Sequence, residues 1–192
     1  MKKFIYLFCM LATVIAFNGC KEGTDFDIDY TPIAPIGGQY DVIVYYGVDE
    51  SKTDAEFWAT HDINSEDVAQ LNEYGDLYAT LSNTTDYDRD KAWIRVGGYS
   101  GKNVYNINAK VSIDMSTYKF YGTGIDDFVG NSATPVDQAT VDGFCTHNQY
   151  KTEASGTLTD YIEFTYSRTG APGYHFKAVG FKYTGWTEDE GY

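Results

Sequence analysis

The sequence predicts an all-β protein whose strands form an antiparallel sandwich or barrel. In its clearest segments apolar residues recur at every second position, which is typical of a strand with one face in a core and the other in water. The links between these segments are short and rich in Gly, Asn, Asp and Thr. Seven or eight strands joined by hairpin-length links, with hardly any helical pattern, favour an antiparallel sheet.

The first 19 residues have the composition of a secretory signal peptide. Lys2 and Lys3 precede the apolar run FIYLFCMLATVIAF, which is shorter than the roughly 20 residues that a membrane-spanning helix needs. The following Asn-Gly-Cys resembles a bacterial lipobox, so we expect Cys20 to be lipidated and to begin the mature chain. The alternative is an ordinary secretory signal followed by an unmodified Cys. Residues 20–36, with acids and two prolines, are expected to form a tether, and 37–192 the folded domain.

The chain is strongly acidic. Its formal net charge of −14 becomes −16 when residues 1–19 are removed, because two lysines leave and no acid does. This charge argues against nucleic acid as a partner, since phosphates need a basic surface, and it keeps the folded body away from anionic lipid headgroups. After removal of the signal and lipidation of Cys20, Cys145 has no partner for an intrachain disulfide.

Two segments show the strand pattern most clearly. In 104–113 the apolar positions are Tyr105, Ile107, Ala109, Val111 and Ile113. In 160–168 they are Ile162, Phe164 and Tyr166. Shorter strands are expected at 39–47, 76–83, 91–98, 117–122 and 143–152.

The final segment, 174–183, is expected to pair with the first strand, because a closed barrel leaves no sheet edge open. A turn containing Gly170, Pro172 and Gly173 joins it to the preceding strand in a hairpin. Its apolar set changes face around Gly180, and this slip of one residue predicts a β-bulge there.

One helix is expected, at residues 65–75. Ser65 can cap its start, Val68 and Leu71 share a face, and Gly75 can end it. The fold should therefore contain at most one or two short helices.

Several segments resemble a family of Bacteroidota lipoproteins labelled "lipid-binding putative hydrolase". The closing GFKYTGWTEDE is similar to the end of the family's domain. LTDYIEFTYSR, YNINAKVSIDMSTYKFYG and LSNTTDYDRDKAWI resemble further family segments in matching order. The resemblance runs from about Gly38 to Glu190. It departs at Lys182 and Tyr183, where the family has a basic pair, and in a longer insert between Gly47 and Asp76.

The resemblance implies a calycin-like eight-stranded barrel, related in shape to lipocalins, on an outer-membrane lipoprotein. The start of the mature chain, Cys20-Lys21-Glu22, also looks like an acidic export signal that sends such lipoproteins to the cell surface. The family label suggests lipid binding or hydrolysis, and neither activity follows from the residues themselves.

Few residues suggest catalysis. The chain has no Gly-x-Ser-x-Gly elbow. Cys145 and His147 are two residues apart on one strand face, so they either pair or form a buried thiol beside a half-exposed imidazole. His61 and His175 stand alone, without zinc-ligand spacing, so no cofactor is expected.

One acidic segment has partial calcium-loop spacing. Asp86, Asp88 and Asp90 occupy the first three ligand positions of an EF-hand, but Lys91 and Gly97 replace the Gly and Glu that complete it. The pattern excludes an EF-hand. It leaves either a weaker surface calcium site or a solvated acidic turn.

An eight-stranded barrel is either filled by side chains or just wide enough for one small ligand. The inward candidates for lining a ligand site are Tyr105, Ile107, Val111, Ile162, Phe164, Tyr166 and Phe176. Because so many are large, they favour a filled centre with any pocket at a mouth. The leading hypothesis is a surface-anchored, non-catalytic lipoprotein that binds a lipid or glycan fragment and assists an outer-membrane uptake complex. The alternatives are a weak hydrolase and a structural or protein-partner module.

Overall fold

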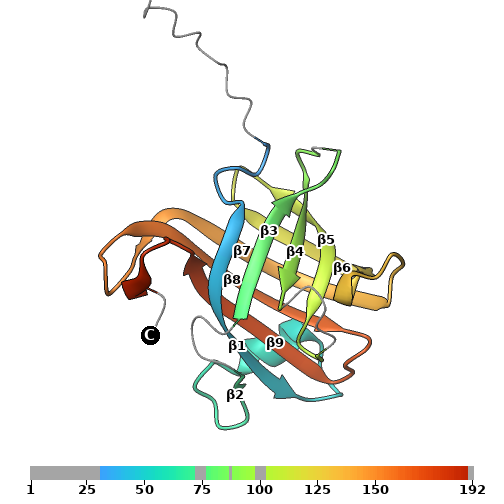
Figure 1. The fold of residues 1–192 in the computed structure, drawn as a ribbon. Coiled ribbons are helices and arrows are strands. Elements are labelled where there is room, and N and C mark those ends of the chain that lie inside the picture. Colours follow the sequence, from blue (N-terminus) through green and yellow to red (C-terminus); the bar gives the residue numbers. More distant parts are fainter. Residues whose placement is uncertain (1–30, 72–76, 87, 98–102, 190–192) are drawn as a thin grey trace, which may run out of the picture. The chain divides into compact units, whose positions relative to one another are not determined.

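The structure, a computed structural model, describes residues 31–71, 77–86, 88–97 and 103–189. These residues form one sheet and little helix (Figure 1). The strands are β1 (Gly38–Val48), β2 (Ala69–Gln70), β3 (Leu77–Asn83), β4 (Lys91–Val96), β5 (Ile107–Asp114), β6 (Lys119–Asp127), β7 (Asp137–Lys151), β8 (Leu158–Arg168) and β9 (Tyr174–Lys182). The helices are α2 (Asp54–Thr60) and the 3-10 turns η1 (Val129–Asn131) and η2 (Thr187–Asp189). None of the described helices is long and apolar enough to cross a membrane.

The sheet is a closed antiparallel barrel, as the sequence predicts. Strands β3 to β9 follow one another in order, and β1 pairs with β3 on one side and with β9 on the other. The β1–β9 seam runs from Tyr40 opposite Lys182 to Val48 opposite Tyr174. The short β2 is an extra strand on the second half of β1. Closure leaves the eight barrel strands without an unpaired long edge.

The barrel interior is filled by side chains. Along β5, Ile107, Ala109 and Val111 are fully buried, and their neighbours point outward, as the alternation predicts. Large residues of the later strands complete one continuous core: Phe120, Phe164, Tyr166 and Phe176, each at most 1% exposed. Among them, Tyr166 and Phe176 stack with ring centroids 5.0 Å apart.

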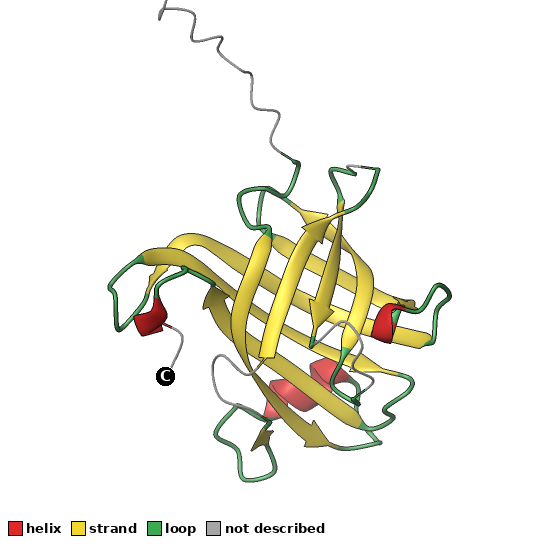
Figure 2. Cartoon of the chain, viewed as in Figure 1, coloured by secondary structure: helices red, strands yellow, loops and turns green. Residues whose placement is uncertain are grey.

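One end of the barrel is closed by the residues that precede β1. Residues 32–36 form a turn, at the top of Figure 2, and Ile33 and Ile36 from this turn are fully buried in the core. The Tyr40 hydroxyl donates a hydrogen bond to the Ile36 carbonyl, which fixes the turn to the first strand. The turn therefore belongs to the same compact unit as the barrel, which includes the chain from Thr31 on.

The predicted bulge at Gly180 is wrong. β9 pairs with β1 and with β8 in continuous register through this residue. The apolar pattern changes face because outward residues are covered from outside at both ends of the strand. His175 lies under α2, and Phe181 stacks on Tyr150, with ring centroids 5.3 Å apart.

The predicted helix at 65–75 is also wrong over its described part. Residues 65–67 lie in turns and Ala69 and Gln70 form β2, while residues 72–76 lie outside the described residues. The α-helix instead lies a few residues earlier, at Asp54–Thr60. The hydrophobic pair Val68 and Leu71 is too small a face to hold a helix against the barrel, since neither residue is buried in the core.

Candidate ligand-binding groove

The helix α2 begins at a capping box. The Thr53 side chain accepts a hydrogen bond from the Glu56 backbone N–H, and the Glu56 carboxylate accepts one from the Thr53 backbone N–H at 2.9 Å. This reciprocal pair satisfies two of the donors that a helix start leaves open. The Thr-x-x-Glu spacing is visible in the sequence and is the signal that could have located the helix.

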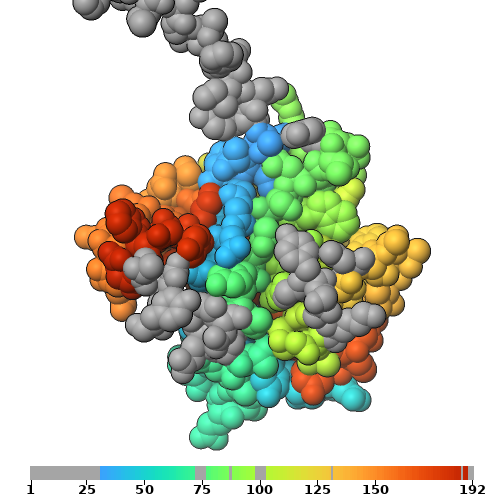
Figure 3. Space-filling view, in the orientation of Figure 1, coloured from blue at the N-terminus to red at the C-terminus, as the bar shows by residue number. Residues whose placement is uncertain are grey.

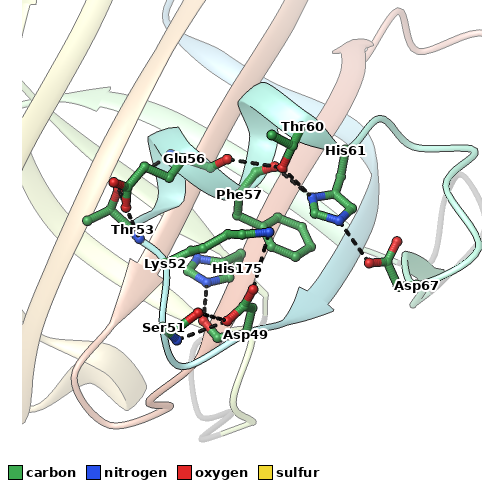
Figure 4. A network of polar contacts seen from close by, with 10 residues as sticks. All are labelled: Asp49, Ser51, Lys52, Thr53, Glu56, Phe57, Thr60, His61, Asp67 and His175. Carbon is green, nitrogen blue, oxygen red and sulfur yellow. Dashed lines mark hydrogen bonds and ion pairs between the residues drawn. The ribbon is translucent and has the colours of Figure 1, made fainter.

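An aromatic stack holds α2 against the barrel wall. The Phe57 ring lies between two imidazoles, with centroids 4.2 Å from His61 and 4.7 Å from His175, and the three planes are nearly parallel (Figure 4). Gly47 of β1 lies against the Cζ edge of the ring: a Cβ at that position would approach the Phe57 Cζ to 2.1 Å. The helix can therefore pack closely only because β1 has a glycine there.

Behind the stack lies a buried polar cluster. One oxygen of the Asp54 carboxylate lies 2.6 Å from the His175 Nδ1. The other accepts a hydrogen bond from the Ser167 hydroxyl at 2.5 Å. The second ring nitrogen of His175 contacts the Asp49 carbonyl oxygen at 2.9 Å. The cluster connects the first turn of α2 with β8 and β9.

Ser167, His175 and Asp54 are the residue types of a serine hydrolase triad, but they are connected differently. In a triad the imidazole stands between the carboxylate and the serine, and it takes the serine proton. Here the serine donates directly to the carboxylate, and both ring nitrogens of His175 are occupied by other partners. As arranged, the cluster positions α2 and does not form the proton relay.

A groove of about 560 Å³ opens beside α2, and we call it the α2 groove. Its walls are the first turn of α2, the β8–β9 hairpin and the neighbouring parts of β6, β7 and β8. The lining residues are Lys52, Thr53, Asp54, Ala55, Thr123, Gly124, Gln138, Ala139, Thr140, Ser167, Arg168, Thr169, Ala171, Pro172, Gly173, Tyr174 and His175. This volume falls within the range of roughly 300–1,000 Å³ of known ligand pockets.

The α2 groove combines apolar surface with a polar rim. Ala55, Ala171, Pro172 and Tyr174 supply the apolar part, while hydroxyl groups line the strand side. Lys52 stands at the rim and pairs with Asp49 at 3.3 Å. Such a surface suits a ligand with an apolar body and a polar or anionic end.

A buried ionic cluster lies where β6 ends, β7 begins and β8 ends. Arg168 of β8 contacts Asp137 at 2.7 Å and Asp127 at 3.3 Å, and it donates a hydrogen bond to the Asn106 carbonyl at 2.8 Å. Asp127 is fully buried. Burial raises the pKa of its carboxyl to about 6, although the Asn108 backbone N–H and the Arg168 charge favour the ionised form.

The expected ligand-lining residues lie in the core and do not line the α2 groove. Six are at most 1% exposed: Ile107, Val111, Ile162, Phe164, Tyr166 and Phe176. Tyr105 is half-buried, and its carbonyl accepts the Tyr166 hydroxyl proton at 2.7 Å. Val111 and Phe164 also border two other pockets of the wall, of about 590 and 240 Å³.

Cys145 and His147 do not pair. Cys145 points into the core, where its sulfur lies 3.8 Å from the Tyr40 hydroxyl, and burial raises the pKa of its thiol to about 12. The His147 Nδ1 contacts Asp160 at 2.9 Å instead. A register shift in β7 after Thr146 turns His147 away from the core. A thiol with such a pKa is not a nucleophile near neutral pH.

The remaining candidate sites are placed only in part. Asp86, Asp88 and Asp90 lie in the β3–β4 turn, with the intervening Tyr87 outside the described residues. The described part of the chain brings no three His, Cys, Asp or Glu side chains together as a metal site. Cys20 lies outside the described residues.

Sequence reasoning missed the residues of the α2 groove. Lys52 and Asp54 flank Thr53, the first residue of the capping box, which the sequence interpretation did not include. Ser167 and His175 sit at outward positions of predicted strands, where a polar residue is the expected choice. The usable sequence signal was the Thr-x-x-Glu spacing of residues 53–56; that His175 is covered on its outer face, at 3% exposure, is known only from the structure.

Comparison with known proteins gives one family match. A family model described as "lipid-binding putative hydrolase" matches residues 25–187. None of the curated proteins compared matches the chain. A solved structure of unknown function from Bacteroides ovatus is similar over 76% of this chain, with 10% identity and a TM-score of 0.41. The chain spans 42% of the length of that protein.

Proposed function

Because the chain belongs to the lipid-binding putative hydrolase family, we propose that its barrel binds a small amphipathic ligand in the α2 groove. The observation that carries this proposal is an apolar groove of about 560 Å³ with a polar rim, on a barrel whose centre is filled. A filled centre directs binding to the wall or to the ends. The groove places apolar side chains beside Lys52 and several hydroxyls, which matches a lipid-like ligand with an anionic end.

The proposal extends to the place of the protein in the cell. Lipidation of Cys20 would hold the protein on the outer membrane, and the acidic body would stand away from anionic headgroups. The ligand would then be presented to an outer-membrane uptake complex, with the barrel as an accessory binding protein. Mass spectrometry of the purified chain tests the anchor: an unacylated Cys20 contradicts it.

Calorimetric titration tests the groove. The titrants are single-chain fatty acids and lysophospholipids below their micelle concentrations. Thr140→Trp fills the groove from β7, and we expect it to weaken binding at least about 10-fold, whereas Thr165→Trp, a half-buried β8 position outside the groove, should leave binding unchanged. Equal affinity in both variants, or no binding of any titrant at millimolar concentration, contradicts the proposal.

Hydrolysis is the second candidate function, and one contact favours it. The Ser167 hydroxyl donates to the Asp54 carboxylate within the groove wall, and a carboxylate can serve as a general base for a nucleophile. Against it, His175 does not face the serine. We expect no turnover of ester substrates by the wild-type chain. Turnover that Ser167→Ala abolishes would replace the binding proposal with an enzymatic one.

A further inference from the structure

A second hollow lies on the outer face of β4 and β5, and we call it the β4–β5 cleft. Strand register places Lys91 opposite Ser112 and Trp93 opposite Lys110, so these four outward residues form a compact quadrilateral. The two lysines occupy diagonal corners, and diagonal neighbours across an antiparallel pair are roughly 7–8 Å apart. The Lys110 Nζ lies 5.4 Å from the centroid of the Trp93 ring.

The cleft exists because β5 and β6 separate locally. The two strands pair at Ala109–Asp127 and again at Ser112–Tyr121, with a register shift between. Gly124, which has a positive φ of 60°, lies in the irregular stretch of β6. The resulting hollow has a volume of about 590 Å³ and is lined by Lys91, Trp93, Lys110, Val111, Ser112, Gly124, Ile125, Asp126 and Phe128.

Lys91 and Lys110 are the two cations of the cleft, and like Lys119 and Lys151 they form no ion pair within the described residues. Lys52, Lys177 and Lys182 each pair with a carboxylate. Two like charges held on neighbouring rigid strands repel each other, and an anion between them would relieve that repulsion.

The other groups in the cleft restrict the kind of anion. Trp93 is half-buried, and Phe128 packs edge-on against it with the two ring centroids 5.6 Å apart. An aromatic surface therefore borders the two lysines. Asp126 and Ser112 are exposed in the same hollow and can accept hydrogen bonds from hydroxyl groups. A carboxylate in the cleft disfavours a compact dianion such as phosphate. It favours a ligand that carries both a negative charge and several hydroxyls.

From these observations we infer that the β4–β5 cleft binds an acidic saccharide through a uronate-type sugar. Lys91 and Lys110 contact the sugar carboxylate, the Trp93–Phe128 pair packs against the apolar face of the ring, and Asp126 and Ser112 accept hydrogen bonds from its hydroxyls. This site is separate from the α2 groove and from its amphipathic ligand. The two hollows share only Gly124 and lie on either side of the irregular part of β6.

Titration of the full chain with oligogalacturonate, followed by NMR chemical-shift mapping, tests the inference. The expected result is shifts confined to residues of the β4–β5 cleft, with a neutral galacto-oligosaccharide of equal length binding at least about 10-fold more weakly. Lys91→Gln with Lys110→Gln should lower oligogalacturonate affinity by a similar factor. Lys151→Gln, which removes one exposed charge on β7, should not.

Several outcomes would overturn the inference. They are no shifts at millimolar oligogalacturonate, equal affinity for the neutral sugar, or full affinity in the double lysine variant. Displacement of the sugar by an equal concentration of inorganic phosphate would also overturn it, since that identifies a plain anion site. Because all these variants are at outward positions, thermal unfolding should be unchanged. The Thr140→Trp variant of the α2 groove should bind the saccharide normally, which keeps the two proposals separable.

Discussion

At the scale of single residues, the buried charge of Asp127 is the feature with the clearest energetic consequence. It lies opposite Asp137 across β6 and β7, and both carboxylates face the single guanidinium of Arg168. Desolvation by burial raises the pKa of Asp127 from its ordinary 3.8 to about 6, and the neighbouring Asp137 adds to this rise while the Arg168 charge opposes it. One oxygen of the carboxylate is nevertheless bound by the backbone N–H groups of Asn108 and Val129.

We expect Asp127→Asn to change how stability depends on pH. A raised pKa in the folded state means that folding favours the protonated acid, so its contribution is fully present below about pH 4 and is lost as pH rises through 6. The wild-type free energy of unfolding should therefore fall by about 2 kcal/mol relative to Asp127→Asn between pH 4 and pH 7.5. Urea unfolding at a series of pH values measures this difference. A difference independent of pH contradicts the prediction, and Asp142→Asn, at an exposed β7 position, serves as the control.

Inward positions were the most predictable residues. Period-two alternation identified Ile107, Val111, Ile162 and Phe164 as core residues, because a strand that is covered on one face admits few exceptions. The alternation failed where a strand has a register shift or where another element packs on its outer face. His147 turns away after the shift in β7, and His175 is buried on the outer face, neither of which alternation encodes.

At the scale of elements, α2 depends on one glycine. The Cζ end of Phe57 points at Gly47 while its ring stacks between two histidines, and the start of its helix supplies Lys52 and Asp54 to the α2 groove. The sequence predicted the helix at 65–75, because that segment offers a cap at Ser65, the apolar pair Val68 and Leu71, and an end at Gly75. A helix this short is held by its cap and its tertiary contacts, and only the cap is readable from the sequence.

Gly47→Ala should displace α2 from the barrel wall. The added methyl group would overlap the Phe57 ring, and overpacking of this kind costs about 1–3 kcal/mol of unfolding free energy. We also expect loss of ligand binding in the α2 groove, since its helical wall moves. The same change in a Phe57→Ala background should cost much less, because no ring is present to overlap. An equal cost in both backgrounds, measured by urea unfolding, contradicts this account.

At the scale of the whole molecule, closure of the barrel holds the last strand and the described residues that follow it, up to Asp189. β9 pairs with both β1 and β8, and the residues after it are held to the β7–β8 hairpin. The Asp189 carboxylate accepts hydrogen bonds from the Ser155 hydroxyl at 2.7 Å and from the Thr184 hydroxyl at 2.8 Å. In Figure 3 the red C-terminal residues accordingly lie against the orange hairpin.

Two truncations separate the contribution of the seam from that of the terminal turn. A chain ending at Tyr183 should fold but lose about 1–3 kcal/mol of unfolding free energy, because it lacks the hydrogen bonds of Asp189. A chain ending at Gly173 should not fold, because removal of β9 exposes the edges of β1 and β8. Circular dichroism and denaturant titration measure both. A cooperatively folded chain without β9 is the result that contradicts a closed barrel as the unit of stability.

The architecture itself was predictable from the sequence. Alternation gave the strands, short links gave their antiparallel order, and the aromatic final segment gave the closing strand. The α2 groove was not predictable, because its lining residues come from four separate segments that only the folded sheet brings together. The residue spacing within any one segment carries no information about which other segments will lie beside it.

The plug formed by Ile33 and Ile36 has a mechanical consequence. Any pull along the chain from its N-terminal side reaches these two side chains before it reaches β1, so the load falls first on apolar contacts inside the barrel end. Withdrawing them would expose the core to water and break the Tyr40–Ile36 hydrogen bond. The load would then fall on β1, which forms the seam with β9. In single-molecule stretching from the N-terminus, the first force peak should therefore belong to extraction of this plug.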